Sequence, residues 1–443
     1  MEPEELLSVA EGALKKIRLD EAECYVSWRL DTEAQLDNGI PSSSRREIAG
    51  IGIRGACGKR VGFASMSSLD HIDRVVEMCS EAGMPENRYF SQLPDPVKGK
   101  RFDVWDERIA SYDDHMNDCI DMTESGKGRD IAYTISDVIT SVRAYAVANT
   151  RGISVCERST EISYYTLCKA KSGDDEKVAY DQVESRRFVH PPDSVSVAKG
   201  ARDLLCGKAL ERKEQNVVFD PLTMGVEDLG LMSMLGYGIS AANVQEHHSA
   251  FEGMIGNEVA SGITIYDDPF LDNGIGSRGY DDEGVPAGKK PIIENGMLKN
   301  YIYDSYSANR DGIKASGNGL RKSLLGGRDN FAMLPEPKLM NCVIEPTCNR
   351  DMEGLIREMD HGILVRYQLM GVLHANNING DFSVVAPSTF LIRNGEIAYP
   401  LKPVTIAGNF YGLLKNIEAV GDDAHIYGDG LIPSIAVKDV ICR

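Results

Sequence analysis

Apolar residues recur with two different spacings in the first half of the chain. Spacings of three and four residues predict helices, which cover 3–18, 69–82, 104–125 and 193–206. Alternation of apolar and polar residues, with many β-branched side chains, predicts strands, which cover 23–30, 48–54, 60–64, 131–148 and 153–170. The order is helix, strand, hairpin, helix and then antiparallel strands. We therefore predict an α/β N-terminal half.

The second half of the chain differs from the first in its apolar pattern and its glycine content. Val217–Phe219 is a short apolar run, and Pro221 opens a helix predicted from the helical spacing of apolar residues over 222–232. Beyond it, glycine content rises and strand patterns dominate. Asn-Gly pairs at 295–296 and 394–395 predict type I′ hairpins, because both central residues of that turn need positive φ. We predict a large antiparallel β-rich C-terminal domain and an α+β fold for the whole chain.

The length of the chain, 443 residues, suggests about three domains at roughly 150 residues each. Two segments have the composition of boundaries: a connector with two prolines at 93–98 and a charged segment at 211–215. We predict an N-terminal α/β domain over 1–95, a central α/β domain over 100–212 and the β-rich domain over 215–443.

Acidic residues outnumber basic ones, since 67 Asp and Glu against 48 Lys and Arg give a net charge of −19. Such a chain repels phosphate backbones and anionic lipid, so we exclude general binding to nucleic acids or membranes. The best apolar stretch, 229–244, is broken by glycines and predicts no membrane span. No secretory signal pattern is present at the first residues. The ten cysteines form no CxxC pair, which indicates reduced thiols and a cytoplasmic protein.

Zinc peptidases bind the metal through two imidazoles one helical turn apart, with a carboxylate beside them. None of the eight histidines is followed by Glu, so neither HExxH nor HExxxH occurs. An alternative metal site would combine His247, His248 and Glu252, with the last two on one helix face. The segment also has the composition of a solvated polar loop, which is the interpretation we favour. We assign no catalytic residue and no metal ligand in this chain.

Polar loops of the C-terminal half contain further candidates. GIGSRG at 274–279 matches GxGxxG but follows no strand, so we predict a loop rather than a dinucleotide site. The acidic run 281–283 predicts turn caps on a solvated face, with paired carboxylates for acid–base chemistry or for calcium as the alternative. Arg278 beside this run predicts an ion pair that orders the loop, and contact with a substrate or partner is the alternative.

The Asn- and Gly-rich loop at 374–383 enters a predicted strand. A structural turn is one interpretation, and a place in the wall of a cleft is the other, because polar loops on a β scaffold often carry sites. Six residues are our candidates for contact with a substrate or a partner: Arg278, Asp282, Glu283, His374, Asp381 and Phe382.

Three stretches resemble one known family. They are DDEGVP at 281–286 running into 292–308, GDFS at 380–383 followed by 391–396, and GIGIR at 50–54 with VGFA at 61–64. On these residues the chain resembles the TldD/PmbA family, also called modulators of DNA gyrase, over nearly its whole length.

This resemblance implies a cytosolic zinc-dependent peptidase system that acts on unfolded or small peptides and is built from two related subunits. The TldD subunit carries HExxxH and a Cys as zinc ligands, whereas PmbA, also called TldE, lacks them. Here 227–235, at the place of that motif, contains no histidine, and 421–430 contains no cysteine. We therefore expect a PmbA/TldE-type subunit with no cofactor of its own and zinc on a TldD-type partner.

Two other functions stay open. One is a non-enzymatic peptide-binding or regulatory protein, and the other is a self-sufficient metallopeptidase that uses His247, His248 and Glu252. We place the chain among metallopeptidases without assigning peptidase activity to it alone. Because related subunits often form symmetric dimers, the isolated chain is also a candidate homodimer.

Overall fold

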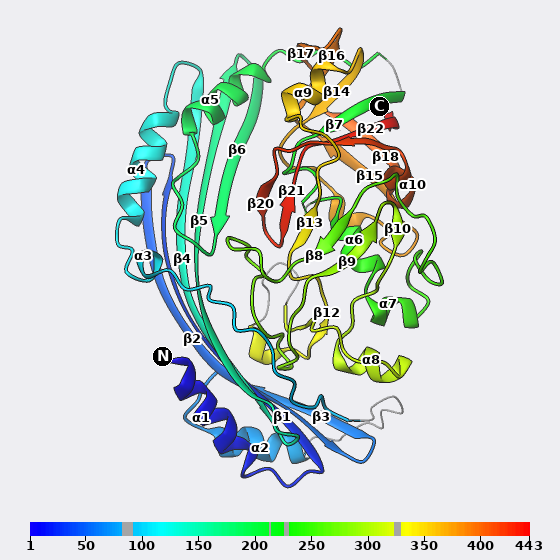
Figure 1. The fold of residues 1–443 in the computed structure, drawn as a ribbon. Helices are drawn as coiled ribbons and strands as arrows, with labels where there is room; N and C mark the ends of the chain where they lie inside the picture. Colours follow the sequence, from blue (N-terminus) through cyan, green and yellow to red (C-terminus); the bar gives the residue numbers. More distant parts are fainter. Residues whose placement is uncertain (82–91, 212–213, 226–229, 323–328) are drawn as a thin grey trace.

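A single antiparallel sheet of six strands runs through the first half of the protein. The computed structural model describes residues 1–81, 92–211, 214–225, 230–322 and 329–443. The strand order is β3-β2-β1-β4-β5-β6. The strands are β1 (Glu21–Asp37), β2 (Ile40–Cys57), β3 (Arg60–Met66), β4 (Ile131–Asn149), β5 (Ser154–Ser172) and β6 (Asp175–Ser185). The strands predicted for this half are confirmed, and in Figure 1 they curl around the second half of the chain.

Helices pack against this sheet, and Figure 1 shows α1, α2 and α4 on the outer side of the curl. The helices are α1 (Pro3–Leu14), α2 (Ile72–Glu81), α3 (Glu107–Ala110), α4 (His115–Gly126) and α5 (Ser194–Asp203). Leu6, Ala10 and Ala13 form the buried stripe of α1, as the spacing predicted. The last residue of the helix predicted over 69–82 lies outside the described residues. None of the described helices has the length and hydropathy needed to cross a bilayer.

The single helix predicted over 104–125 is wrong, because α3 and α4 are separate. The Asp106 side chain accepts a hydrogen bond from Arg108 N and caps α3. The Ser111 hydroxyl donates to the Glu107 carbonyl at 2.7 Å, at the end of that turn. Side chains that bond to nearby backbone compete with helix continuation, which the apolar spacing does not reveal.

Two further sheets build the second half. One has eight strands in the order β15-β18-β22-β7-β14-β16-β17, with β19 paired to β22, and the other has six in the order β10-β9-β8-β13-β21-β20. Most neighbours run antiparallel, whereas β13 with β21 and β14 with β7 run parallel. The largest apolar core of the described residues lies in this half. The α+β class and the β-rich C-terminal half are thereby confirmed.

The strands and helices of the second half have the following residue ranges. The eight-stranded sheet contains β7 (Glu214–Phe219), β14 (His361–Val365), β15 (Asp381–Ala386), β16 (Thr389–Arg393), β17 (Glu396–Pro400), β18 (Val404–Asn409), β19 (Ile417–Val420) and β22 (Ile435–Cys442). The six-stranded one contains β8 (Ile265–Asp267), β9 (Lys290–Glu294), β10 (Met297–Leu298), β13 (Cys342–Ile344), β20 (His425–Tyr427) and β21 (Gly430–Ile432), and β11 (Gly319–Leu320) pairs with β12 (Glu336–Pro337). The short helices are α6 (Ser233–Gly238), α7 (Ala241–Gln245), α8 (Ser305–Asp311), α9 (Met352–Arg357), α10 (Phe410–Lys415), η2 (Asn330–Ala332) and η3 (Val372–His374).

Both predicted Asn-Gly hairpins are confirmed. Asn295 and Gly296 join β9 to β10 with φ angles of 49° and 80°. Asn394 and Gly395 join β16 to β17 with φ angles of 52° and 78°. Positive φ at both central positions is the requirement from which these turns were predicted.

The helix predicted from Pro221 is wrong, because the chain forms turns there and α6 begins only at Ser233. The Asp220 carboxylate accepts a hydrogen bond from Thr223 N at 3.0 Å, and the Thr223 hydroxyl donates to the Asp220 carbonyl at 2.8 Å. These local bonds offer the backbone an alternative to a helix. Part of the predicted helix, 226–229, lies outside the described residues.

The inner face of the curled sheet contacts the C-terminal half through glycines of β2. A Cβ atom at Gly50 would lie 2.5 Å from the Phe331 ring, and one at Gly52 would lie 2.2 Å from the Phe331 carbonyl oxygen. The two halves therefore interlock at a place where no larger residue fits. Strands of the predicted domains 1–95 and 100–212 join this one sheet, and the domain boundaries themselves stay predictions.

Candidate functional site

The acidic run at 281–283 lies inside the protein. Its three side chains are 0%, 1% and 0% exposed, so the solvated face predicted from the sequence is wrong. The predicted turn cap is confirmed at Asp281, whose carboxylate accepts hydrogen bonds from the N–H groups of Glu283 (3.0 Å), Val285 (2.8 Å) and Gly319 (2.9 Å). Burial and the nearby charge of Glu283 raise the pKa of Asp281.

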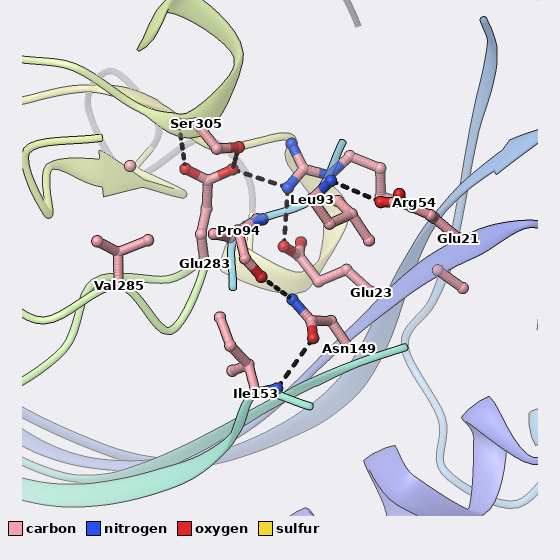
Figure 2. Close-up of polar contacts among 12 residues, drawn as sticks. Glu21, Glu23, Arg54, Leu93, Pro94, Asn149, Ile153, Glu283, Val285 and Ser305 are labelled. Carbon is pink, nitrogen blue, oxygen red and sulfur yellow. Dashed lines mark hydrogen bonds and ion pairs between the residues drawn. The ribbon is translucent and has the colours of Figure 1, made fainter. Parts of the chain in front are cut away.

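Glu283 belongs to an ionic network that joins the two halves of the chain (Figure 2). Arg54 Nη2, from β2, lies 2.7 Å from Glu283 Oε1 and 2.8 Å from Glu23 Oε2. Ser305 N, at the start of α8, donates to Glu283 Oε2 at 2.6 Å, and Arg321 pairs with Glu23. Burial lowers the pKa of Arg54, but the two carboxylates outweigh it and raise that pKa above its usual value. Two guanidinium groups thus balance two carboxylates in the interior.

The connector predicted at 93–98 is bonded to the same end of the sheet (Figure 2). Leu93 N donates to Glu21 Oε2 at 2.6 Å, and Asn149 Nδ2 donates to the Pro94 carbonyl at 2.9 Å. Asn149 Oδ1 also accepts from Ile153 N at 3.0 Å. The connector is therefore fixed by hydrogen bonds at the place where the two halves meet.

Asp282 and Glu283, two of the six candidates from the sequence, contact groups of this chain. Arg278 Nη1 lies 2.7 Å from Asp282 Oδ1, so the predicted ion pair is confirmed. Asp282 also accepts from Arg321 N at 2.7 Å. That Asp282 and Glu283 face a substrate or a partner stays a prediction.

A cavity of about 90 Å³ lies between the inner face of the six-stranded sheet and the C-terminal half. Arg278 lines it, as do two arginines of the sheet: the strand register places Arg29 of β1 directly opposite Arg143 of β4. Other lining residues are Arg186, Tyr25, Tyr145, Glu157, Asp329 and Phe331. The cavity thus combines guanidinium groups with an aromatic wall.

Guanidinium groups crowd one side of this cavity. Glu161 Oε2 lies 3.2 Å from Arg143 Nη2 and 3.4 Å from Arg186 Nη1, so two arginines share one carboxylate. Burial lowers the pKa of Arg186 to about 10, although the charge of Glu161 opposes the shift, and repulsion from Arg143 and Arg278 adds to it. This side of the cavity is therefore a favourable place for an anion.

Arg278 is the only one of these lining residues singled out from the sequence. Arg29, Arg143 and Arg186 are far apart along the chain and belong to no local motif. Their one visible signal is that Arg29 and Arg143 occupy polar positions of alternating strands. Only the pairing of β1 with β4 brings them together.

His374, at the end of η3, and Asp381, the first residue of β15, both lie at the surface, and β15 is an edge strand of the eight-stranded sheet. Asn379 Nδ2 and Asn409 Nδ2 both donate to the Asp381 carboxylate at 2.9 Å. Phe382 is 6% exposed, and its ring packs in the main core. Four large apolar side chains of the same segment are exposed, and we call them the apolar edge: Met370 (60%), Leu373 (47%), Ile378 (42%) and Val385 (36%).

The alternative metal site does not have the geometry expected from the sequence. The chain leaves α7 at Gln245, and His247 has a φ of 60°, so His248 and Glu252 do not share a helix face. His247 Nδ1, rather than His248, lies 2.8 Å from Glu252 Oε1, on an exposed turn. The arrangement is that of a hydrogen bond between two surface side chains.

Two family models match the chain. The model described as the PmbA/TldA metallopeptidase C-terminal domain matches residues 212–442. The model described as PmbA/TldA metallopeptidase domain 1 matches residues 22–83. Together they include the main core and the first strands of the curled sheet.

Individual proteins show the same likeness. A metalloprotease TldD homolog of Buchnera aphidicola subsp. Acyrthosiphon pisum is 34% identical over 194 residues, which is 44% of this chain and only 38% of that relative's length. The metalloprotease PmbA of Escherichia coli O157:H7 is 24% identical over 381 residues, 81% of this chain and 78% of that protein. The crystal structure of TldE from Thermococcus kodakarensis has a TM-score of 0.86 at 24% identity and covers 98% of this chain and 99% of its own. The fold is therefore shared along the whole chain.

Proposed function

The chain belongs to the PmbA/TldD metallopeptidase family, and from this membership we propose that it is the PmbA/TldE-type subunit of a cytoplasmic zinc peptidase system. It binds unfolded or small peptides together with a TldD-type partner, and the partner cleaves them. One observation carries this proposal: no histidine among the 443 residues is followed by Glu, so the chain lacks HExxxH.

The residues at the place of the zinc motif do not fit the metal, which prefers imidazole, thiolate or carboxylate ligands. Met234 and Leu235 of α6 are fully buried in the main core, and the Ser233 hydroxyl donates to the Gly230 carbonyl at 2.8 Å. Residues 227–229 lie outside the described part of the chain. Among the residues that are described, no three His, Cys, Asp or Glu side chains are grouped to bind a metal ion. We derive no step of the reaction through a metal on this chain.

The apolar edge supports a subunit role. Exposed apolar groups that gather on one surface segment are typical of protein–protein contacts. His374 and Asp381, which the sequence offers as partner-facing, lie in the same segment. We assign this segment to contact with the TldD-type subunit, and with a second copy of the chain when that subunit is absent.

The test is reconstitution with a purified TldD-type protein. This chain alone should not hydrolyse an unfolded protein substrate, and neither should its mixture with a zinc-free partner. Hydrolysis should appear when this chain is mixed with the zinc-loaded partner. A chelator should abolish it. Turnover by this chain alone, with stoichiometric zinc that is lost in His248→Ala, would instead establish a self-sufficient metallopeptidase. Peptide binding without hydrolysis in every pairing would indicate a regulatory protein.

A further inference from the structure

Arginines form a row across the inner face of the curled sheet. Arg29 and Arg143 are cross-strand neighbours in the register of β1 and β4, and Arg143 is opposite Ser159 of β5. Arg186 reaches the same row, with Nη1 3.1 Å from the Ser159 hydroxyl. Like charges directly opposite each other destabilise a sheet unless something neutralises them.

The chain's own carboxylates neutralise this row unevenly. Arg29 has Asp31 at 2.9 Å and Asp329 at 3.7 Å, whereas Arg143 and Arg186 share the single carboxylate of Glu161. The Nε–H of Arg143 is buried and makes no hydrogen bond to any described group. Arg29 Nε also lacks a hydrogen bond, but it lies 2.9 Å from Asp31 Oδ2, whereas Arg143 shares its one carboxylate with Arg186. Arg143 therefore has capacity for a further anion. A carboxylate fits such a group, because its two oxygens match the guanidinium fork.

The cavity beside this row suits more than an inorganic ion. Tyr25 and Tyr145 stack with ring centroids 6.0 Å apart and form an apolar wall together with Phe331. A volume of about 90 Å³ is several times the roughly 10–15 Å³ that a cavity needs to hold one water molecule. The side chains of Arg29 and Arg143 are 33% and 36% exposed, so the cavity is open to solvent at the arginine row.

Glu157 and Asp329 also line the cavity and would repel a carboxylate placed beside them. Glu157 lies on the aromatic side, where it accepts from Gly279 N at 3.1 Å and its Oε2 lies 2.7 Å from the Tyr145 hydroxyl. Asp329 Oδ1 lies 3.7 Å from Arg29 Nη2. Glu161 already pairs with both Arg143 and Arg186, but it is one carboxylate for two guanidinium groups, so the Arg143 end of the row keeps an excess of positive charge for the anion.

We propose that this cavity binds the C-terminal end of a peptide, with the terminal carboxylate on Arg143 and the last side chain against Tyr25, Tyr145 and Phe331. Arg186 contributes only its charge, because its Nε donates to the Ile275 carbonyl at 2.8 Å and its Nη1 to the Ser159 hydroxyl. The inference rests on the proposed function and deepens it, because it names the part of the peptide that this chain recognises. Recognition of this kind would accept peptides of many sequences, since every linear peptide ends in a carboxylate.

The experiment measures binding to the isolated full-length chain by calorimetry. The probes are N-acetyl-Ala-Ala-Leu with a free carboxylate, the same peptide as its C-terminal amide, and inorganic phosphate. We expect the acid to bind at least tenfold more tightly than the amide. Arg143→Ala should remove this difference, and Arg143→Lys should retain part of it, because lysine keeps the charge without the fork. Arg45→Ala, at an exposed arginine of β2 outside the cavity, should change neither affinity.

Circular dichroism during thermal unfolding shows whether each variant is folded. If Arg143→Ala is not folded, the preference for the acid over the amide is measured on Arg143→Lys instead. Equal binding of acid and amide would overturn the inference, as would phosphate binding without peptide binding. If the reconstituted mixture hydrolyses peptides while acid and amide bind equally, the proposed function stands and this site is rejected. If the acid is preferred but no pairing hydrolyses peptides, the site stands and the catalytic role is rejected.

Discussion

At the scale of single residues, each buried charge where the two halves meet is stabilised only by its oppositely charged neighbours. Arg54 contacts both Glu23 and Glu283, and Arg321 contacts Glu23. Taking a charge out of water costs several kcal/mol, and only the paired partner offsets that cost. Removing one member therefore leaves the others buried without compensation.

We expect Arg54→Met to lower the free energy of unfolding by about 3–5 kcal/mol, because Glu23 and Glu283 lose their shared partner. Urea unfolding monitored by circular dichroism measures the change. Arg45→Met, at an exposed position of the same strand, should cost no more than about 0.5 kcal/mol. Equal losses in the two variants would show that the network contributes nothing specific.

At the scale of elements, caps and turns determine where helices and hairpins lie. Asp304 caps α8, and its Oδ1 accepts from Ser307 N at 2.8 Å. Burial and the charge of Glu283 raise the pKa of Asp304 to about 7, although Ser307 opposes the shift. The first turn of this helix is therefore coupled to the ionic network through a titratable group.

This coupling predicts a dependence of stability on pH. The folded-state pKa of Asp304 lies above its ordinary value of 3.8, so the folded protein binds an extra proton and the stability from Asp304 falls as pH rises from about 4 to about 7. The slope from one proton is at most about 1.4 kcal/mol per pH unit. The stability of Asp304→Asn, which keeps a capping oxygen, should lack this component when urea unfolding of both proteins is compared across that range. A parallel pair of curves would contradict the shift.

The hairpin between β9 and β10 allows steric and conformational costs to be separated. A Cβ at Gly296 would lie 2.3 Å from the Ala260 carbonyl oxygen, whereas Gly39, with φ of 85°, has nothing within 4 Å of that position. Gly39→Ala should cost about 1 kcal/mol from the positive φ alone. Gly296→Ala should cost about 3 kcal/mol, because the contact adds to the strain. Thermal unfolding of both variants tests the order, and equal costs would show that the neighbouring loop gives way.

At the scale of the whole molecule, we expect the curled sheet and the C-terminal half to unfold together, because they interlock at β2. A Cβ at Gly52 would lie 2.2 Å from the Phe331 carbonyl oxygen, and Arg54 of the ionic network belongs to the same strand. Close packing of this kind does not tolerate even a methyl group. Cooperative unfolding therefore depends on small residues at one place in β2.

We expect Gly52→Ala to weaken this contact, so that calorimetry resolves two unfolding transitions where the parent protein shows one. Gly12→Ala in α1, where nothing lies within 4 Å of the added methyl, should instead stabilise the protein by up to about 1 kcal/mol. A single transition at an unchanged temperature in Gly52→Ala would show that the contact at Gly52 accommodates a methyl group and is not what makes unfolding cooperative.

Local chemistry by itself determined several features of this protein. The strand segments, α1, α5 and both Asn-Gly hairpins follow from periodicity and turn residues, which act over a few neighbours. The missing HExxxH is likewise a property of the sequence, and so is the net charge of −19. The resemblance in 281–308 is sufficient to place the chain in its family, which the family models confirm.

Only the tertiary structure decided the rest. Asp281–Glu283 have the composition of a surface turn, yet they are buried because Gly319, Arg321 and Arg54 reach them from distant segments. The helix predicted from Pro221 gives way to a turn that Asp220 stabilises. The arginine row exists because strand register, a long-range property, places Arg29 against Arg143. Burial and register depend on which segments meet, and no local pattern contains that information.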